Sequence, residues 1–414
     1  MKRPLLLIIL TILFVTGIHF AGCGRSGGVL ASLPGWDSLD TSFGTNGTVT
    51  TDLGSGVPAY AFAVAIQSDG KIVAVGSTST HFALARYNTD GSLDTGFGTG
   101  GIVTAPSGAA NAVAIQSDGK IVAAGSSSTY FALVRYNTDG SLDTSFGTNG
   151  IVTTLSGGAG AVAIQSDGKI VAVGSSSLVR YNTDGRLDTS FGTNGIVTTP
   201  PGTASVAVQA DGKIVAAWSS SSGSSGFALE RYNTDGSLDA SFGTNGIVTT
   251  LSGGASAVAI QSDGMIVAAG SSTYPSDFTL ARYSTGGSLD TRFGTSGKAI
   301  TDFGSANDTL RAIAIQIDGK IVTAGQSATA SRSVFALTRY NTDGSLDTTF
   351  GANGRIAVGT RWAGAHAVAL QTDGKIVAAG YSYTARYAYK EGHLHTIGPP
   401  FTGNPVFTLT RYLP

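Results

Sequence analysis

A short pattern of apolar and polar positions returns seven times along this chain. An apolar run such as Ala112–Ile115 is followed by Gln, one further residue, Asp-Gly and a second apolar run such as Ile121–Ala124. Two short apolar runs joined at Asp-Gly, a pair that tolerates positive φ, predict a β-hairpin. An array of one small β unit is therefore expected. The Gln residues of the copies are Gln67, Gln116, Gln165, Gln209, Gln261, Gln316 and Gln371.

Each copy contains four candidate strands, and together the copies predict an all-β, seven-bladed β-propeller with four-stranded antiparallel blades. The candidates in one unit are Gly101–Ala105, Ala112–Gln116, Lys120–Gly125 and Phe131–Tyr136. Four strands in about 50 residues are typical of a propeller blade. An open solenoid would need atypical capping repeats, and the end copies keep the full pattern. The small Ala-Val-Ala-Ile-Gln segment suits the innermost strand, next to a narrow axis.

The phase of the repeat predicts how the ring closes. The first copy begins at Ser38 with a strand near Gly47–Thr51, and the last copy ends at Arg411-Tyr412. If Ala-Val-Ala-Ile-Gln is innermost, the outer strand of each blade comes from the following sequence repeat. The N-terminal strand is then expected to complete the last blade.

Two further elements recur in all seven copies and are interpreted as structural. Leu-Asp-x-x-Phe-Gly and Arg-Tyr supply one Asp and one Arg per copy, and these are expected to pair because buried charges need partners. The sequence leaves open whether each pair forms within one blade or between neighbouring blades. Representative residues are Arg86, Asp94, Arg135, Asp143, Arg231 and Asp239.

The repeated segments resemble the delta-60 repeat family of bacterial propellers. Gln-x-Asp-Gly-Lys-Ile-Val, Arg-Tyr-Asn-x-Asp-Gly-Ser-Leu-Asp and Phe-Gly-x-x-Gly carry the resemblance over residues 38–413. The repeat is also distantly similar to the NHL propeller repeat. The resemblance implies the fold rather than an activity.

The N-terminal segment is similar to a lipoprotein signal peptide. Lys2 and Arg3 precede an apolar run, Leu5–Ile18, that is too short to span a bilayer as a helix. Ala21-Gly22-Cys23 then resembles a lipobox, with Phe20 in place of the usual Leu. Residues 1–22 are expected to be removed, Cys23 to be lipidated, and 23–37 to form a tether before a propeller at 38–414. The expected location is the cell envelope, at the outer membrane or cell surface, with the lipid as the only membrane contact.

Composition narrows the classes of partner. Charged residues are 12% of the chain, the formal net charge is −1, and Lys and Arg form no cluster. A nucleic-acid partner is therefore not expected. Only two acidic residues are Glu, which argues against helices. A monomer is expected.

Because features shared by all copies are structural, the departures are the candidates for binding. Trp218 replaces a Gly found in other copies, and the last copy carries a long insertion from Tyr381 to Pro405. Aromatic side chains provide amphipathic contact surface, so this loop is the leading candidate. The residues of this candidate binding loop are Trp218, Tyr381, Tyr383, Tyr387, Tyr389, Glu391, His393 and His395.

No metal, cofactor or catalytic constellation is assigned. Glu391, His393 and His395 alternate in a way that an extended strand could turn toward a metal, but chance placement on the surface is the favoured interpretation. Asn88-x-Asp90-Gly91-x-x-Asp94 superficially resembles a calcium loop and is also a common turn. Calcium stays open as a minor alternative.

Two functions follow. The favoured one is an envelope-anchored propeller that binds or scaffolds a protein or glycan partner. The alternative is an extracellular polysaccharide hydrolase or lyase with its site on the central face, since paired carboxylates suffice for glycoside chemistry. Whether the chain is an enzyme stays uncertain, with binding preferred.

Overall fold

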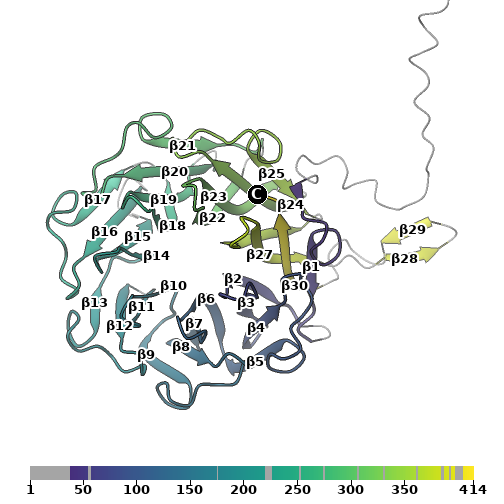
Figure 1. Cartoon of the computed structure of the whole chain (residues 1–414), viewed down its shortest axis with the longest axis horizontal. Helices are drawn as coiled ribbons and strands as arrows, with labels where there is room; N and C mark the ends of the chain where they lie inside the picture. Colours follow the sequence, from purple (N-terminus) through teal and green to yellow (C-terminus); the bar gives the residue numbers. More distant parts are fainter. Residues whose placement is uncertain are drawn as a thin grey trace, which may run out of the picture. The chain divides into compact units, whose positions relative to one another are not determined.

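The computed structural model describes residues 38–414 except 55–56, 175, 220–225, 251–252, 274–275, 305–306, 330–331, 360–361, 384–386, 391–392 and 397–403. The chain divides into two units, Met1–Leu33 and Pro34–Pro414, and the described residues lie in the second. Seven four-stranded antiparallel sheets are arranged in a ring as the blades of a β-propeller (Figure 1). The predicted fold class is confirmed. Within the described ranges, no helix is long and apolar enough to cross a membrane.

Each blade has an inner, a second, a third and an outer strand. The inner strands are β2 (Tyr60–Ile66), β6 (Ala109–Ile115), β10 (Ala161–Ile164), β14 (Thr203–Val208), β18 (Gly254–Ile260), β22 (Asn307–Ile315) and β26 (Ala363–Leu370). The second strands are β3 (Ile72–Ser77), β7 (Ile121–Ser127), β11 (Ile170–Gly174), β15 (Ile214–Ser219), β19 (Ile266–Ser271), β23 (Ile321–Thr329) and β27 (Ile376–Tyr383).

The third and outer strands complete the blades. The third strands are β4 (His81–Tyr87), β8 (Tyr130–Tyr136), β12 (Ser177–Tyr181), β16 (Phe227–Tyr232), β20 (Phe278–Tyr283), β24 (Arg332–Tyr340) and β30 (Pro405–Tyr412). The outer strands are β5 (Ile102–Ser107), β9 (Ile151–Ser156), β13 (Ile196–Thr198), β17 (Ile247–Thr250), β21 (Lys298–Thr301), β25 (Arg355–Val358) and β1 (Thr48–Thr51). A separate ribbon pairs β28 (Tyr387–Lys390) with β29 (His393–Thr396).

The N-terminal strand closes the ring as expected. β1 pairs with β30 from Thr48↔Thr410 to Thr51↔Phe407, so the last blade uses both ends of the described chain. Beside this ladder, Arg411 forms an ion pair of 2.8 Å with Asp40. The closure of the ring therefore depends on residues more than 360 positions apart.

Each inner strand except β10 carries a β-bulge near its start. In β2, Ala61 pairs with Gly76 and Ala63 with Val75, which leaves Phe62 as the extra residue. The same shift recurs in β6, β14, β18, β22 and β26, and Gly160 holds the equivalent position just before β10. Because a bulge changes the direction of its side chain, the residue at this position points differently from its neighbours in the strand.

The strand directions give the propeller two distinct faces. Inner strands end at the Asp-Gly turns, and third strands end at the Asn-x-Asp-Gly turns, so both kinds of turn lie on one face. We name it the repeat face. The bulges, the loops between second and third strands, and the connections between blades lie on the opposite face, named the variable face. The insertion between Tyr383 and Pro405 leaves its blade on the variable face, because these two residues pair at the far end of β27 from its Asp-Gly turn.

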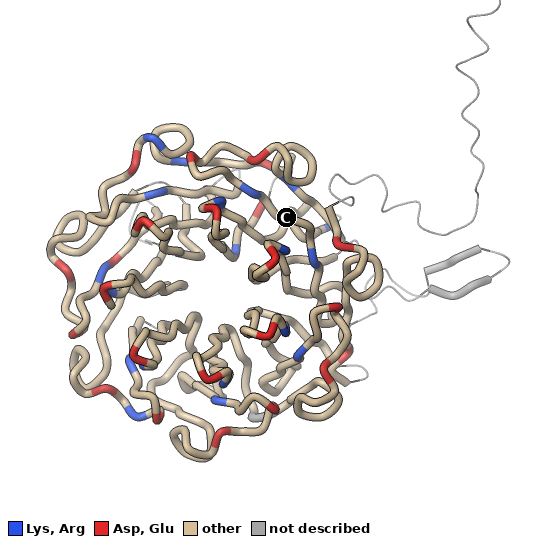
Figure 2. The backbone as a smooth tube through the Cα atoms, viewed as in Figure 1, with Lys and Arg blue, Asp and Glu red and all other residues tan. Residues whose placement is uncertain are grey.

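A repeated ion-pair network stabilises the repeat face. Each repeated Arg pairs with the Asp eight residues later, as in Arg135–Asp143 at 2.7 Å, and the last pairs with Asp40. The Arg135 guanidinium also lies 4.4 Å over the ring of Phe146 and donates to the carbonyl of Thr183 in the next blade. These residues are buried and fully partnered, as a structural role requires. Figure 2 shows the cationic and anionic positions repeating together around the ring.

One blade shows that the network needs two cations. In most copies the Lys of Asp-Gly-Lys adds a second contact, as in Lys120–Asp143 at 2.8 Å. Met265 replaces this Lys in the fifth copy, and there Arg292 pairs with Asp290 at 2.9 Å instead. The second cation is thus replaced from another position in the same blade.

Candidate functional site

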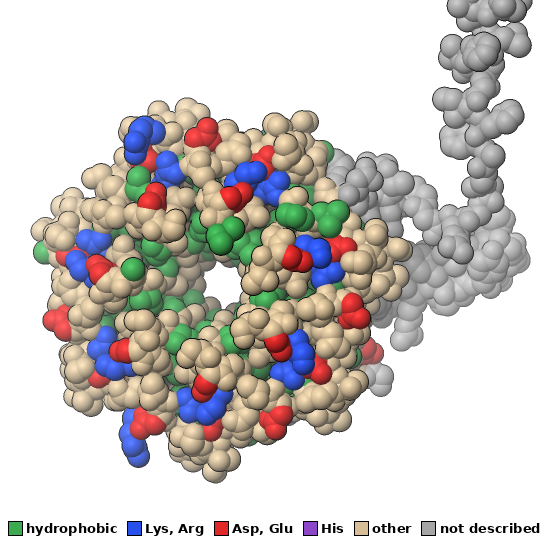
Figure 3. Space-filling model, in the orientation of Figure 1, with side chains coloured by type: hydrophobic (Ala, Val, Ile, Leu, Met, Phe, Trp, Pro, Cys, Tyr) green, Lys and Arg blue, Asp and Glu red, His purple; other side chains and the backbone are tan. Residues whose placement is uncertain are grey.

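The central channel is one of several concave sites in the described part of the chain, and it lies at the centre of the ring. Its cavity is about 730 Å³ and is lined chiefly by the inner strands of all seven blades. Figure 3 shows the channel open at the ring centre, with apolar side chains around it and the repeated charges farther out. Ligand sites in proteins are usually concave and combine apolar walls with placed polar groups, and this channel combines small apolar strand residues with a large share of polar surface.

The seven bulge positions make the channel asymmetric. All of them line the channel, and no two carry the same residue. The neighbouring inner-strand positions, by contrast, repeat Ala, Val and Ile in nearly every copy. In blade order, starting from β2, the bulge residues are Phe62, Asn111, Gly160, Ala204, Ser256, Arg311 and His366. The wall of the channel therefore differs from blade to blade at this position, unlike the repeated strand positions beside it.

Large and small bulge residues lie on opposite sides of the ring. Arg311, His366 and Phe62 belong to three consecutive blades, those of β22, β26 and β2. Gly160 and Ala204 belong to the blades of β10 and β14 across the axis. One half of this channel mouth is therefore filled by side chains, and the other half is left open by small residues.

An aromatic cluster covers the junction between the blades of β26 and β2. The rings of Phe62 and His366 stack at 5.1 Å with an interplanar angle of 16°, and Tyr60 lies parallel to Phe62 at 6.0 Å. Tyr381 packs edge-on against Tyr60 at 5.3 Å and against Tyr383 at 5.9 Å. Burial and the hydroxyl of Tyr383 raise the pKa of Tyr60 to about 12. The cluster is therefore uncharged near neutral pH.

His366 is held as a neutral imidazole with a defined tautomer. Its Nδ1 lies 3.0 Å from the carbonyl oxygen of Ala61, and because a carbonyl only accepts, Nδ1 carries the proton. Burial and the nearby charge of Arg311 lower the pKa of His366 to about 4. Nε2 is then an unprotonated acceptor. Asn111 makes the equivalent contact between the blades of β6 and β10. Its Nδ2 donates to the carbonyl oxygen of Ala159 at 2.8 Å.

Arg311 is the charged member of the ring. It is the only side chain with a permanent charge among the described residues that line the channel, and no carboxylate lines it. Arg311 is exposed, and its positive charge lowers the pKa of His366. The repeated arginines differ from Arg311, because each of them forms an ion pair with an aspartate.

The residues predicted from sequence departures fall into two groups. Tyr381 and Tyr383 belong to the aromatic cluster at the channel mouth. Glu391 lies outside the described residues, and for Tyr387, Tyr389, His393 and His395 the structure describes only the backbone pairing of β28 with β29. Cys23 also lies outside the described residues.

Trp218 has a structural consequence. At the equivalent Gly125, a Cβ atom would lie 1.8 Å from the carbonyl oxygen of Ala109, so a side chain there displaces that carbonyl. Accordingly β14 begins at Thr203, which pairs with Trp218, and Gly202 stays outside the strand. Trp218 is partly buried, and its neighbour Ser219 is the one of the two that lines the channel.

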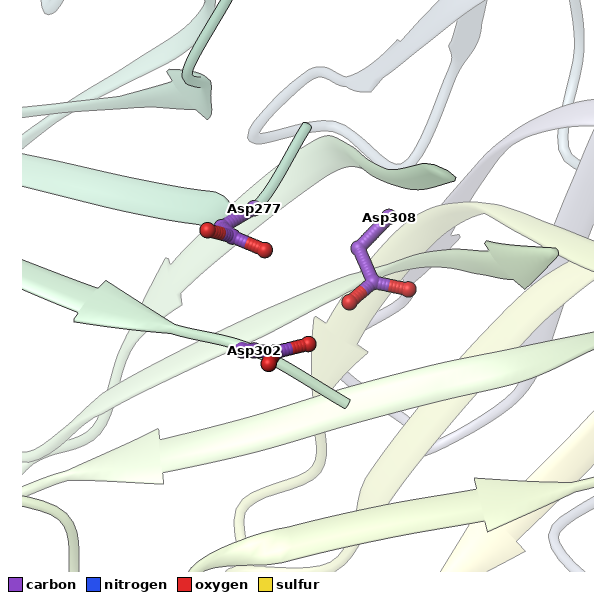
Figure 4. A group of neighbouring side chains, drawn as sticks. All are labelled: Asp277, Asp302 and Asp308. Atoms are coloured by element: carbon purple, nitrogen blue, oxygen red, sulfur yellow. The ribbon is translucent and has the colours of Figure 1, made fainter. Parts of the chain in front are cut away.

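Three carboxylates converge elsewhere on the variable face. Asp277, Asp302 and Asp308 each place an oxygen within 4.8 Å of the others, and they are the only such group of potential metal ligands among the described residues (Figure 4). Asp308 is fully buried and accepts from the backbone N–H of Phe303 at 2.8 Å. Burial and the two neighbouring carboxylates raise the pKa of Asp277. Such a group offers the oxygen ligands that calcium prefers.

The motif that resembles a calcium loop is instead a hydrogen-bonded turn. Asp90 Oδ1 accepts from the backbone N–H and the hydroxyl of Ser92, at 2.9 and 2.6 Å. Asp94 accepts from Lys71 and Arg86, both at 2.8 Å. Asp90 Oδ1 and the Asp94 carboxylate are therefore engaged within the protein.

The ring of bulge residues was missed in the sequence analysis, although its signal is present there. Aligning the seven copies on their Gln residues shows that the fifth position before Gln varies while its neighbours repeat. The three aspartates carry no comparable signal, because Asp277 lies between β19 and β20 while Asp302 and Asp308 lie at the connection from β21 to β22, and only the fold brings these two places together.

Comparison with a family model agrees with the repeats. Six segments match the model described as "Domain of unknown function (DUF5122) beta-propeller", at residues 67–97, 116–146, 165–191, 209–242, 261–293 and 316–350. Each segment runs from a repeated Gln to a repeated Phe. The chain therefore carries repeats of a β-propeller repeat family. No curated protein sequence matches the chain.

Solved structures share the fold at low sequence identity. A catalytically inactive virginiamycin B lyase from Staphylococcus aureus with quinupristin has a TM-score of 0.51 and 11% identity, over 88% of this chain and 98% of that one. Sqt1 from Chaetomium thermophilum, bound to the N-terminus of ribosomal protein L10, has a TM-score of 0.50 and 14% identity, over 78% and 94%. A protein from Lactobacillus plantarum has a TM-score of 0.50 and 12% identity, over 86% and 100%.

Proposed function

We propose that this repeat propeller is a binding module, and that its ligand site is the channel mouth on the variable face. The observation that carries the proposal is the ring of seven different bulge residues. Blades that agree nearly everywhere else differ at the one inner-strand position that combines a bulge with exposure to the channel. A purely structural ring has no need of this difference.

The partner class that we propose is a protein or a glycan. Propellers of this general architecture do bind proteins, as in the complex of Sqt1 with the N-terminus of ribosomal protein L10. The aromatic cluster with Tyr381 and Tyr383 extends the mouth toward the insertion after Tyr383. Together they supply amphipathic surface beside a polar, asymmetric cavity.

An enzyme acting on a polysaccharide is the second candidate. A hydrolase that uses paired carboxylates finds no carboxylate among the described residues that line the channel. A lyase is favoured over a hydrolase by one observation, namely the neutral His366 beside Arg311. An imidazole that is unprotonated at neutral pH is able to accept a proton.

We also propose that the propeller is tethered to the cell envelope through Cys23, within a repeat family of the delta-60 type. The support is the resemblance of Ala21-Gly22-Cys23 to a lipobox and of the repeats to that family. Partitioning into a detergent phase tests the anchor. Loss of partitioning in Cys23→Ala supports it, and unchanged membrane association contradicts it.

A glycan array combined with binding to isolated envelope proteins tests the binding function. The double variant Phe62→Ala, Arg311→Gln is compared with Ile317→Ser, which changes an exposed residue on the repeat face. We expect the double variant to lose binding and Ile317→Ser to keep it. Equal binding by both variants would place the site elsewhere. Turnover of a polymer in the same screen, seen as new unsaturated ends, would favour the lyase.

A further inference from the structure

The charge of the channel mouth points to an anionic ligand. Arg311 is exposed within the cavity, and no carboxylate among the described lining residues opposes it. Among the described residues, its guanidinium has no ion pair or hydrogen bond, whereas Arg135 is held by Asp143 at 2.7 Å. A guanidinium presents a planar fork of donors that matches a carboxylate in a bidentate contact.

The aromatic cluster beside Arg311 gives the channel mouth one rigid side. Tyr60, Phe62 and His366 stack nearly parallel, with angles of 8° and 16° between successive rings, so they largely cover one another's faces. The bulge residues facing this cluster across the axis are Gly160 and Ala204. The space left for a compact ligand therefore lies in the open half of the mouth, within reach of the polar groups that flank it.

The remaining polar groups at the mouth are small and uncharged. Asn111 and Ser256 lie at bulge positions that flank the open half, and Ser205 and Ser219 also line the channel. His366 Nε2 adds an acceptor next to Arg311, because Nδ1 is committed to Ala61. This mixture of amide, hydroxyl and imidazole groups complements a ligand that is dense in hydroxyls.

From these observations we propose that the channel mouth binds an acidic sugar, a uronate residue of a glycan, with its carboxylate on Arg311 and its hydroxyls toward the amide, hydroxyl and imidazole groups of the mouth. The inference rests on the proposed binding function and specifies its ligand. An acidic peptide would satisfy Arg311 but would offer few hydroxyls to these groups.

Calorimetric titration of the full chain tests this inference. The probes are short oligomers of galacturonate, glucuronate and mannuronate, each paired with its methyl ester, which keeps the ring and removes the charge. We expect at least one acid to bind roughly tenfold or more tightly than its ester, as loss of a charged hydrogen bond predicts. Arg311→Gln should abolish that preference. Arg332→Gln, an arginine of the variable face outside the channel lining, should retain it.

Three outcomes would overturn the inference. These are equal binding of acids and esters, an acid preference that persists in Arg311→Gln, and binding of oligoglutamate in place of every uronate. The last two leave the binding function standing. Failure of the binding function would give a different result. The double variant Phe62→Ala, Arg311→Gln would then bind every partner in the glycan and envelope-protein screens as well as the wild type does. Unchanged melting temperatures confirm that the variants are folded.

Discussion

The two faces of this propeller differ in how far their residues vary from blade to blade. On the repeat face, seven copies of the same turn, ion pair and Arg–Phe contact recur with nearly constant distances, such as 4.4 to 4.7 Å from guanidinium carbon to ring centre. On the variable face, the bulge residues differ in all seven blades, and the aromatic cluster, the three aspartates and the long insertion each occur once.

The difference separates stability from recognition. Buried ion pairs and closing strands stabilise the ring, so every blade must keep them. Bulge side chains are exposed or partly buried, so substitution there costs little folding energy. The variable face is therefore free to change while the repeat face holds the ring together. Four predictions test this separation.

Removal of the closing segment should give the largest effect. Deleting residues 38–52 removes β1 and Asp40, leaving Arg411 buried without its carboxylate. Four ladder bonds and one buried pair together correspond to roughly 7 kcal/mol of unfolding free energy. Calorimetry should show one cooperative transition at a much lower temperature. Replacing residues 384–404 with a short Gly-Ser link should change it little. Loss of structure confined to the last blade would contradict the closure.

Breaking one repeated pair should come next. Arg135→Ala removes the ion pair with Asp143, the hydrogen bond to Thr183 and the contact with the Phe146 ring, and leaves Asp143 with Lys120 as its cation. The loss should lower the free energy of unfolding in urea by about 3–5 kcal/mol. Arg186→Ala breaks a pair whose side chains are 84% and 44% exposed, and should cost less than about 1 kcal/mol. Similar losses in the two variants would show that the repeated network is not special.

His366 should make stability fall in mild acid. Its pKa is about 4 in the folded chain and about 6.5 when unfolded, so the unfolded state binds more protons between these values. Stability is then full above about pH 6.5 and declines by about 3 kcal/mol as the pH approaches 4. His366→Gln should flatten this part of the pH profile, and His81→Gln, at an exposed position, should not. Parallel profiles for all three proteins would exclude this role.

Asp277 should give the smallest change, and with the opposite sign. Its raised pKa means that its ionisation opposes folding at neutral pH, since burial and the repulsion of the two neighbouring carboxylates both disfavour its charge. Asp277→Asn should raise the melting temperature by about 1–2 °C at pH 7, with the gain disappearing in acid below the ordinary pKa of Asp. Asp52→Asn is the matched control. Asp52 is the equivalent of Asp302 in another blade, where Ala59 and Val406 stand in the places of Asp308 and Asp277, so it has no acidic neighbours of this kind. A lower melting temperature in Asp277→Asn would refute the repulsion.

The sequence was sufficient for the fold because the fold repeats. Each Asp-Gly turn and apolar run was visible seven times, and the phase of the first copy placed Thr48–Thr51 in the last blade. The site was harder to predict because it depends on single differences. Phe62 and His366 are about 300 residues apart and meet only through ring closure. The insertion is a strong sequence signal because it is long. The bulge position is a weak signal, because it is a single varying residue in each inner strand.

Ligand binding by a variant of the channel mouth tests the central claim most directly. Phe62, Asn111, Ser256, Arg311 and His366 would all be changed to Ala, which makes the mouth nearly uniform while the repeat face stays intact. We predict that binding detected on the glycan array or to envelope proteins is lost while the cooperative unfolding transition is retained. Full binding by this variant would contradict the assignment of recognition to the variable face.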